Sequence, residues 1–501
     1  MHESVKSKHG SVISAREAVL KALLAFRRND AWPDIALGGF IEKYDISALD
    51  AALATRILNG VMQNLLLCDH YISHFSSIEI KKIEPRVLDI LRISVYQIVF
   101  MDKIPHSAAV NEGVKLAKKS ANPRAAGFVN AVLRKVAQAT ESGALPDVSG
   151  GLVERLSIRY SHPQWLVKEL IAILGEDDCE AFLASDNDAD LPVVVQVNTL
   201  LTDTDKALAE LDADGVGAVR HKWLDNCIEM RGSRGITRLD AFKNGSVYVQ
   251  DAASRLAVYA ADPRSGDFVI DGCAAPGGKS FASAIAMGNS GRIIACDIHE
   301  SKLLRLIEGA KRLGITIIDS ICKDMAELTP AMYVTPRIHI TPSQNVTDSS
   351  EEFSDANENN PAASSSSSKK CRIDEYIGKA DIVFADVPCS GFGAIRKKPE
   401  IRYKSGPDIS GLPDIQQKIL MTLSAYVKPG GTLLYSTCTI LKCENEDIIN
   451  EFLRNNEEYT TEGFSLPGIG SVQSGMITLW PHIHGTDGFF ICKLRRRAAR
   501  V

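Results

Sequence analysis

Residues 268–280 read FVIDGCAAPGGKS, which predicts a buried strand, a glycine-rich turn and the start of a helix. Such a turn lets a ligand approach the free backbone amides at the helix start. The spacing excludes a phosphate loop, because that loop needs a glycine five residues before Gly278, where Cys273 stands. The dinucleotide pattern G-x-G-x-x-G is also absent. The stretch therefore predicts an α/β, Rossmann-like fold whose cofactor loop differs from both common nucleotide loops.

Apolar strands alternate with helical stretches from about residue 250 to the end of the chain. The strands are FVIDGCA, RIIACDI, ITIIDSI, DIVFADVP and GTLLYSTC. This alternation implies parallel pairing through right-handed crossovers, and therefore a doubly wound sheet. A last pair, GMITLWP and DGFFICKL, is separated too briefly for a helical crossover. We expect that pair to form an antiparallel hairpin.

Two aspartates follow the second and third of these strands. Asp297 ends the second strand, at the distance from the glycine turn where a carboxylate accepts hydrogen bonds from ribose hydroxyls. Asp324 follows the third strand, where we expect it to contact an adenine amino group. One such aspartate alone is often only a helix cap. The turn and both aspartates, in this order at successive strand ends, predict a nucleoside cofactor.

Two cysteines follow the fourth and fifth strands. The fourth strand leads into Asp386-Val387-Pro388-Cys389-Ser390-Gly391 and the fifth into Tyr435-Ser436-Thr437-Cys438-Thr439. For either cysteine alone a buried structural thiol is the better interpretation. The carboxyl ends of parallel strands meet at one edge of the sheet, so both thiols should lie beside the cofactor. That placement favours a chemical role.

The combination of two thiols and a carboxylate fits methylation of cytosine at C5. That carbon is a poor nucleophile, and a thiolate that adds to C6 makes it reactive. A proton near N3 stabilises the adduct, which suits an acid such as Asp386. A base must then remove the C5 proton before the thiolate leaves. An enzyme that methylates amino groups would instead carry an acidic or Asn-Pro-Pro-aromatic loop at the fourth strand.

The chain in front of the sheet is predicted to form two further units. The first unit spans 1–140, in which residues from about 14 to 140 read as helices throughout, and Ser14-Ala-Arg-Glu17 matches a capping box at the first of them. ESGALPDVSGG then reads as a linker. Residues 155–248 mix helical and strand patterns and predict a small α+β domain. The sheet domain spans 249–497, interrupted at 341–368 by a polar stretch that we interpret as a disordered loop.

Composition describes a globular chain without a membrane anchor. The 501 residues are 45% hydrophobic and 24% charged. No apolar run approaches a membrane span and no signal sequence begins the chain, so a cytoplasmic location is expected. The eleven cysteines include no C-x-x-C pair. We therefore expect neither a disulfide framework nor a metal site.

The net charge of −5 argues weakly against a nucleic-acid binder. The five acids and no bases of residues 341–368 account for all of this net charge, so the rest of the chain balances. Basic residues cluster in two runs, which are Arg396, Lys397, Lys398, Arg402 and Lys404, and Arg495, Arg496, Arg497 and Arg500. Taken alone, such runs favour a solvated face or a tail.

Several motifs together resemble one family. They are DGCAAPGGKS, DVPCSGFGAIRKKPEIRY, YSTCT and LWPHIHGTDGFF in the sheet domain, with IPHSAAVNEGVKLAKK, GFVNAVLR and RYSHPQWLV before it. They resemble the bacterial Sun/Fmu (RsmB-type) small-subunit ribosomal RNA cytosine-5 methyltransferases, of the wider NOL/NOP2/Sun group. The resemblance covers nearly the whole chain. It implies a NusB-like helical RNA-binding domain, S-adenosyl-L-methionine as cofactor, and 16S ribosomal RNA, free or in an early small-subunit particle, as substrate.

The resemblance also implies roles for individual residues. Cys438 corresponds to the family's nucleophile and Cys389 to the cysteine that helps to release the product, with Asp386 beside them. The implied cofactor contacts are Cys273, Ala274, Ala275, Pro276, Gly277, Gly278, Lys279, Asp297, Asp324 and Asp386. No membrane partner is implied, and we expect a monomer.

The sequence departs from the family pattern at two positions, and it leaves two alternatives to the proposed activity and residue roles open. Phe392 stands where a smaller or aliphatic residue is common, and Gln196 where an arginine is common, so both are expected to alter the fit to RNA. One rival is a NusB-like RNA-binding or transcription-factor protein with an inactive methyltransferase domain. The other exchanges the thiols, so that Cys389 attacks as in DNA cytosine-5 methyltransferases.

Overall fold

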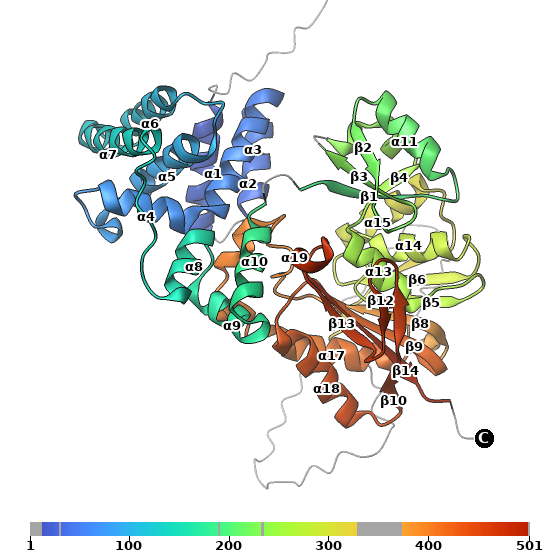
Figure 1. The fold of residues 1–501 in the computed structure, drawn as a ribbon. Coiled ribbons are helices and arrows are strands. Elements are labelled where there is room, and N and C mark those ends of the chain that lie inside the picture. The colour runs from blue at the N-terminus through green and yellow to red at the C-terminus, as the bar shows by residue number, and fades with distance from the viewer. Residues whose placement is uncertain (1–12, 30–31, 189–190, 232–234, 328–372, 499–501) are drawn as a thin grey trace, which may run out of the picture.

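The computed structural model describes residues 13–29, 32–188, 191–231, 235–327 and 373–498. A helical front, a small sheet and a large sheet follow one another along the chain (Figure 1). The polar stretch 341–368 lies outside the described residues. Among those that are described, no helix is both long and apolar enough to cross a membrane.

The helical front contains seven α-helices. They are α1 (Ala15–Asn29), α2 (Pro33–Lys43), α3 (Ala48–Gln63), α4 (Leu65–Phe75), α5 (Pro85–Phe100), α6 (His106–Ser120) and α7 (Pro123–Glu141). Helix α5 lies at the centre, because most of its residues are buried in one apolar core that all seven helices share. Ser14 caps α1 by accepting from the Glu17 amide, while the Glu17 carboxylate pairs with Lys119 of α6. The expected helical bundle is confirmed.

Three further helices connect the front to the large sheet domain. They are α8 (Leu152–Tyr160), α9 (Gln164–Leu174) and α10 (Glu176–Asp186). Their apolar faces share a core with segments from the end of the chain. Phe182 of α10 packs edge-on against Trp480, and Trp165 of α9 packs edge-on against Phe392. These helices therefore pack against the large domain, although the sequence pattern grouped most of them with the small one.

The small domain is built on a four-stranded antiparallel sheet in the order β2-β3-β1-β4. Its strands are β1 (Val193–Val197), β2 (Gly217–Arg220), β3 (Cys227–Arg231) and β4 (Val247–Val249), and its helices are α11 (Thr204–Ala213) and α12 (Asp240–Lys243). The residues on one face of this sheet form a separate apolar core with α11, and residues of the opposite face, among them Cys227 and Tyr248, are buried in the core of the large domain. The expected small α+β unit is present.

The large sheet has eight strands, in the order β10-β14-β9-β8-β5-β6-β7, with β13 paired to β14. The parallel strands are β5 (Phe268–Asp271), β6 (Arg292–Asp297), β7 (Ile318–Cys322), β8 (Ala380–Asp386) and β9 (Val427–Thr437). The antiparallel strands are β10 (Tyr459–Thr461), β13 (Met476–Leu479) and β14 (Phe489–Arg496). The predicted doubly wound sheet and the predicted hairpin are both confirmed.

Helices cover both faces of this sheet because alternate strand residues face opposite ways. Ile382 and Phe384 of β8 pack with α13 (Ala252–Ala261), α14 (Gly278–Ala286) and α15 (Glu300–Arg312). The intervening Val383 and Ala385 pack with α17 (Leu412–Ser424) and α18 (Glu446–Asn455). Smaller elements complete the domain, namely α16 (Gly406–Ile409), β11 (Phe464–Leu466), β12 (Gly470–Val472) and α19 (Pro481–His484).

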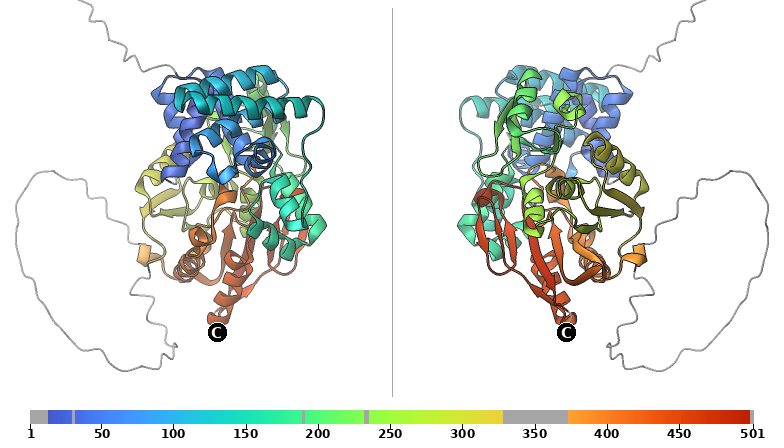
Figure 2. Two further views of the ribbon diagram at one scale, coloured as in Figure 1. Left: turned by 90° about the vertical axis from the view of Figure 1, so that its left-hand side faces the viewer. Right: turned by 90° about the vertical axis from the view of Figure 1, so that its right-hand side faces the viewer.

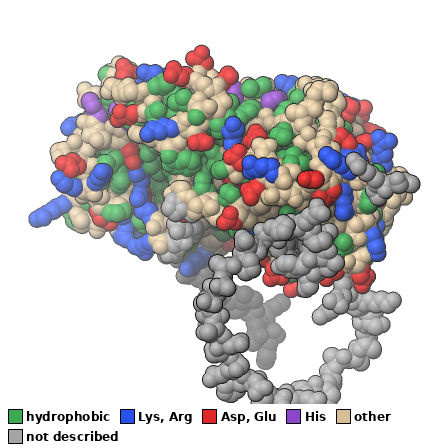
Figure 3. Space-filling model, turned by 90° about the horizontal axis from the view of Figure 1, so that it is seen from below, with side chains coloured by type: hydrophobic (Ala, Val, Ile, Leu, Met, Phe, Trp, Pro, Cys, Tyr) green, Lys and Arg blue, Asp and Glu red, His purple; other side chains and the backbone are tan. Residues whose placement is uncertain are grey.

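The helical front lies over one end of the large sheet domain. Both side views place the front helices above and the large sheet below, with the C terminus at the far end (Figure 2). The face seen from below mixes Lys and Arg side chains with Asp and Glu (Figure 3). The described part of that face is therefore not of one charge.

Candidate active site

The strand order reverses direction at β5, because β6 and β7 lie on one side of it and β8 and β9 on the other. Ligands of doubly wound sheets bind at this switch point, beyond the carboxyl ends of the strands. Those ends carry Asp271 on β5, Asp297 on β6, Asp386 on β8 and Thr437 on β9. The sheet thus brings the sequence-predicted glycine turn, aspartates and cysteines to one edge.

The glycine turn closes between β5 and α14 through backbone bonds. The Gly277 amide donates to Ala274 O (2.7 Å), and the Ala274 amide donates to Cys296 O (2.7 Å). Gly277 has φ +111°, and a Cβ there would lie 2.5 Å from the Phe281 ring. Both facts require glycine. The Ala275 amide donates to Asp297 Oδ2 (3.3 Å), so the turn and the predicted ribose ligand are already in contact.

Free polar groups around this turn fit S-adenosylmethionine, which carries a ribose, an adenine and an amino-acid tail. No side chain caps the first amides of α14, so they are available to a carboxylate. The buried Asp271 accepts from Ser280 through Oδ2 (2.7 Å), and its Oδ1 has no hydrogen-bond partner among the described residues. Burial raises the pKa of Asp271 to about 6. Asp324 is half-buried and caps the next turn through the Ala326 amide (2.8 Å).

The Lys279 side chain faces the predicted catalytic carboxylate, Asp386. Its side chain is 6% exposed, and Nζ lies 2.6 Å from Asp386 Oδ2. Nζ also donates to Ser254 Oγ (3.1 Å) and lies 5.1 Å from the centre of the Phe489 ring. Asp386 accepts a second bond from Ser436 Oγ (2.7 Å). The lysine that follows the glycine turn therefore faces the predicted carboxylate of β8.

The two cysteines touch each other. Cys389 Sγ and Cys438 Sγ are 3.3 Å apart. The hydrogen bond from Cys389 lowers the pKa of Cys438, against the opposing effects of burial and of the Asp386 carboxylate, which the Lys279 charge partly offsets. The same bond, together with burial, raises the pKa of Cys389 well above its usual value. The arrangement favours a thiolate on Cys438 and a protonated Cys389.

The loop that carries Cys389 is fixed by contacts to its flanks. The Ser390 amide donates to Glu444 Oε2 (2.8 Å), and Ser390 Oγ donates to Glu444 Oε1. The Gly393 amide donates to Cys438 O (2.9 Å), and the Gly488 amide donates to Gly393 O (2.8 Å). The sequence analysis did not identify Glu444 or Asp271 as site residues, because the sequence around a single carboxylate does not indicate which residue it will contact. Asp271 ends the quoted strand, and that position was the available clue.

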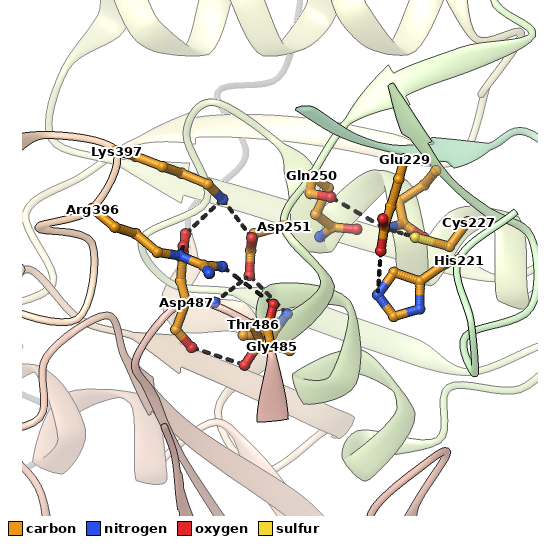
Figure 4. Close-up of polar contacts among 12 residues, drawn as sticks. His221, Cys227, Glu229, Gln250, Asp251, Arg396, Lys397, Gly485, Thr486 and Asp487 are labelled. Carbon is orange, nitrogen blue, oxygen red and sulfur yellow. Dashed lines mark hydrogen bonds and ion pairs between the residues drawn. The ribbon is translucent and has the colours of Figure 1, made fainter. Parts of the chain in front are cut away.

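An ion cluster of Asp251, Arg396, Lys397 and Asp487 joins three segments (Figure 4). It lies near the thiol pair, because the Asp487 charge acts on the pKa of Cys438. Lys397 Nζ contacts Asp251 Oδ2 (2.5 Å) and Asp487 Oδ2 (2.7 Å). Arg396 Nε contacts Asp487 Oδ1 (2.7 Å). Asp251 also caps helix α13 by accepting from the Ala253 amide (2.9 Å). The cluster therefore ties the Cys389 loop to the start of α13 and to the turn before β14.

The interpretation of the basic runs as a solvated face or tail is wrong for most of their described members. Arg402 is fully buried, and Arg396 and Lys397 are paired as just described. In the second run Arg495 pairs with Glu462, with Nη2 and Oε1 2.7 Å apart. Arg496 donates to Val427 O (2.6 Å). These cations hold the fold together because each has an internal acceptor, and Arg500 lies outside the described residues.

The two departures from the family pattern also lie inside the protein. Gln196 is 2% exposed and donates to Gln250 O (3.1 Å) and Cys227 Sγ (3.3 Å). Phe392 is fully buried in the core shared with α8–α10. Neither side chain reaches the surface, so the expected effect on the fit to RNA would have to act through the residues that pack against them.

Comparisons with known proteins agree with this architecture. The NusB family model matches residues 13–138, the RsmF/B-like ferredoxin-like domain model matches 162–237, and the model described as 16S rRNA methyltransferase RsmB/F matches 258–335 and 364–495. The predicted order of a NusB-like front, a small domain and a Rossmann-like methyltransferase domain is confirmed.

Full-length relatives carry the same description. The "Probable ribosomal RNA small subunit methyltransferase B" of Bacillus subtilis is 32% identical over 97% of this chain and 99% of its own. The relative with the same name from Synechocystis is 30% identical, and the match covers 97% of this chain and 100% of the relative. The solved structure titled "Crystal Structure of PH0851" is 26% identical, covers 96% of this chain and 98% of its own, and has a TM-score of 0.72. The chain belongs to the 16S rRNA methyltransferase RsmB/F family.

Proposed function

We propose that this protein transfers a methyl group from S-adenosyl-L-methionine to C5 of a cytosine in 16S ribosomal RNA, through a covalent bond between Cys438 and C6. The observation that carries the proposal is the contact between Cys389 and Cys438, 3.3 Å apart beside the Lys279–Asp386 pair. A buried thiol with a lowered pKa next to a second, protonated thiol is the equipment that covalent attack on C6 needs.

The first step forms the bond between Cys438 Sγ and C6 of the cytosine. The electron pair of the C5–C6 double bond moves towards N3, and a proton there stabilises the adduct. Lys279 Nζ and Asp386 Oδ2 lie 2.6 Å apart, and this pair is the one we assign to supply the proton. The bound cofactor supplies the methyl group to the electron-rich C5. Cys389 is not consumed in these steps.

The second half of the reaction restores the aromatic ring. C5 loses its proton to a base, the electron pair reforms the C5–C6 double bond, the bond between C6 and Cys438 Sγ breaks, and the proton at N3 returns to the Lys279–Asp386 pair. The leaving thiolate is stabilised by the Cys389 thiol, which donates to it. This geometry supports the assignment of Cys438 as nucleophile and of Cys389 as the residue that assists release.

Ribosomal RNA as the substrate is supported by the names of the full-length relatives and by the NusB-family front. The inactive-module alternative is opposed by the intact glycine turn and the paired thiols. We expect the purified chain to incorporate labelled methyl groups into 16S ribosomal RNA or an early small-subunit particle. Mapping 5-methylcytosine in ribosomal RNA from cells with and without this protein identifies the position, and no difference between the two maps would contradict the proposal.

The roles of the thiols are tested by single substitutions. Cys438→Ala should form no bond to RNA and should not methylate. Cys389→Ala should attack, stall, and accumulate as a protein–RNA adduct that survives denaturing electrophoresis and requires both cofactor and an unmodified cytosine. An adduct with Cys438→Ala and none with Cys389→Ala would exchange the roles. Full activity in both variants would show that the thiols are structural.

A further inference from the structure

A short segment links the loop of Cys389 to the helical front. This strap, residues 399–404, begins with the 3-10 helix Pro399–Tyr403 and comes ten residues after Cys389. Arg402 in it is 0% exposed. Its Nη1 donates to Gln63 O of α3 (2.9 Å), to Tyr160 O of α8 (3.1 Å) and to Asn187 Oδ1 after α10 (2.8 Å). One side chain therefore joins three parts of the chain.

The next residue makes a parallel set of contacts. Tyr403 Oη donates to Met62 O (2.7 Å) and Ser161 O (3.3 Å). Met62 and Gln63 are the last residues of α3, whose terminal carbonyls have no partner within the helix. A guanidinium and a phenol hydroxyl suit these carbonyls, because the end of a helix carries partial negative charge. The strap thus caps a helix of the front.

The last residue of the strap holds the catalytic loop. Lys404 Nζ donates to Ser390 O (2.7 Å), the residue after Cys389, and also lies 5.2 Å from the ring centre of Trp32 at the start of α2. Ile401 packs close to Gly391, because a Cβ added at Gly391 would lie 3.3 Å from Ile401 Cδ1. The path from the carbonyls of α3 to Cys389 therefore runs through direct contacts at every step.

The buried charge is better explained by positioning than by stability. Removing a guanidinium from water is unfavourable, and well-packed apolar side chains of similar volume often stabilise a fold as well or better. Arg402 Nε and Nη2 have no hydrogen-bond partner among the described residues, so its burial is only partly compensated. What an apolar side chain lacks is the fixed geometry of bonds to three separate segments.

We propose that the strap positions Cys389 against Cys438 by anchoring the catalytic loop to the helical front, so that this front sets the geometry of the thiol pair as well as contacting RNA. Arg402 and Tyr403 are positioning residues in this arrangement and touch neither substrate nor cofactor. A small displacement of a reacting group is enough to slow a reaction substantially. The front is then part of the catalytic unit.

The sharpest test compares two tyrosine-to-phenylalanine variants. Tyr403→Phe removes the half-buried bonds to Met62 O and Ser161 O, and Tyr459→Phe removes a fully buried bond from a phenol to Ser424 O (2.6 Å) elsewhere in the large domain. Each loses one phenol hydroxyl that donates to the backbone, and the melting temperature of Tyr459→Phe should fall at least as far as that of Tyr403→Phe, because the Tyr459 hydroxyl is the more buried. Only Tyr403→Phe should lower kcat for methyl transfer, by about tenfold, with KM for RNA unchanged. Arg402→Met should lower kcat further.

A second readout needs neither RNA nor cofactor. The rate at which iodoacetamide alkylates Cys438, followed by mass spectrometry of its peptide at fixed pH, reports the state of the thiol pair directly. Tyr403→Phe should change this rate while Tyr459→Phe leaves it as in the wild type. If the two variants had equal effects on kcat and on the alkylation rate, or if Tyr403→Phe changed only KM, the proposal that the strap positions Cys389 would be overturned. A wild type that does not methylate ribosomal RNA would refute the proposed function and leave the alkylation result standing.

Discussion

Replacing Cys389 with alanine should change how the attack of Cys438 depends on pH. Cys389 Sγ and Cys438 Sγ lie 3.3 Å apart, and the hydrogen bond between them is the main cause of the lowered pKa of Cys438. A hydrogen bond to a charged acceptor contributes about 1.5–3 kcal/mol, and 1.36 kcal/mol corresponds to one pKa unit. A thiol is a weak donor, so the lower end applies. Cys389→Ala should therefore raise the pKa of Cys438 by about one unit.

The consequence for the rate follows from two opposing effects. Below the pKa, the thiolate fraction falls about tenfold when the pKa rises by one unit. A more basic thiolate is a better nucleophile, with a Brønsted coefficient of about 0.4–0.5. The net loss is then about threefold to fourfold below the pKa. Above both pKa values the variant should be faster than the wild type by about the same factor, so the two pH profiles should cross.

Single-turnover methyl transfer with enzyme in excess measures this step, because release of the RNA comes later. The first-order rate should be followed from about pH 6 to about pH 10 for the wild type and for Cys389→Ala. Cys443→Ala is the matched control, since Cys443 is an exposed thiol outside the pair. Its profile should match the wild type. An unmoved midpoint in Cys389→Ala, or one moved to lower pH, would refute the hydrogen bond as the cause.

Three further outcomes are expected. Asp297→Ala should weaken cofactor binding about tenfold or more by calorimetry, since a bond to a charged acceptor is lost, whereas Asp319→Ala, at the opposite end of the next strand, should not. Gly393→Ala should lower stability by about 1–3 kcal/mol and stall methyl transfer, because its Cβ would lie 1.8 Å from Gly488 O. Gly127→Ala has free space in α7 and should raise the melting temperature slightly. Deletion of residues 341–368 should leave melting and methyl transfer nearly unchanged, because that stretch has few apolar groups to bury.

The sheet and the position of the site could be predicted because both follow from local patterns. A short apolar run that ends in a glycine turn specifies a strand and a helix start without any knowledge of distant residues. Strand alternation fixes parallel pairing, and parallel pairing places all carboxyl ends at one edge. Cys389 and Cys438 were therefore expected to meet, although 48 residues separate them in the sequence.

The partners of charged side chains could not be predicted in this way. Lys279 reads as part of a cofactor loop, yet its nearest charged partner is Asp386, which belongs to a strand more than 100 residues later. Gln196 stands at a position common for arginine, and the sequence does not tell that its side chain donates to Gln250 O in the interior. Which face a residue occupies depends on the register of the sheet, and one step of register moves a side chain to the opposite face.

The basic run at 396–404 shows why charge counted along the sequence says little about attraction to RNA. A cation that is already paired with a carboxylate of the protein has little net charge left to attract phosphate. Here Arg396 pairs with Asp487, and Lys397 pairs with both Asp487 and Asp251. Arg402 donates to Gln63 O of the helical front and to Tyr160 O of α8. Arg396, Lys397 and Arg402 therefore fix the loop of Cys389 from two sides, and only a small part of the positive charge in this run, such as that of the exposed Lys398, is left to attract RNA.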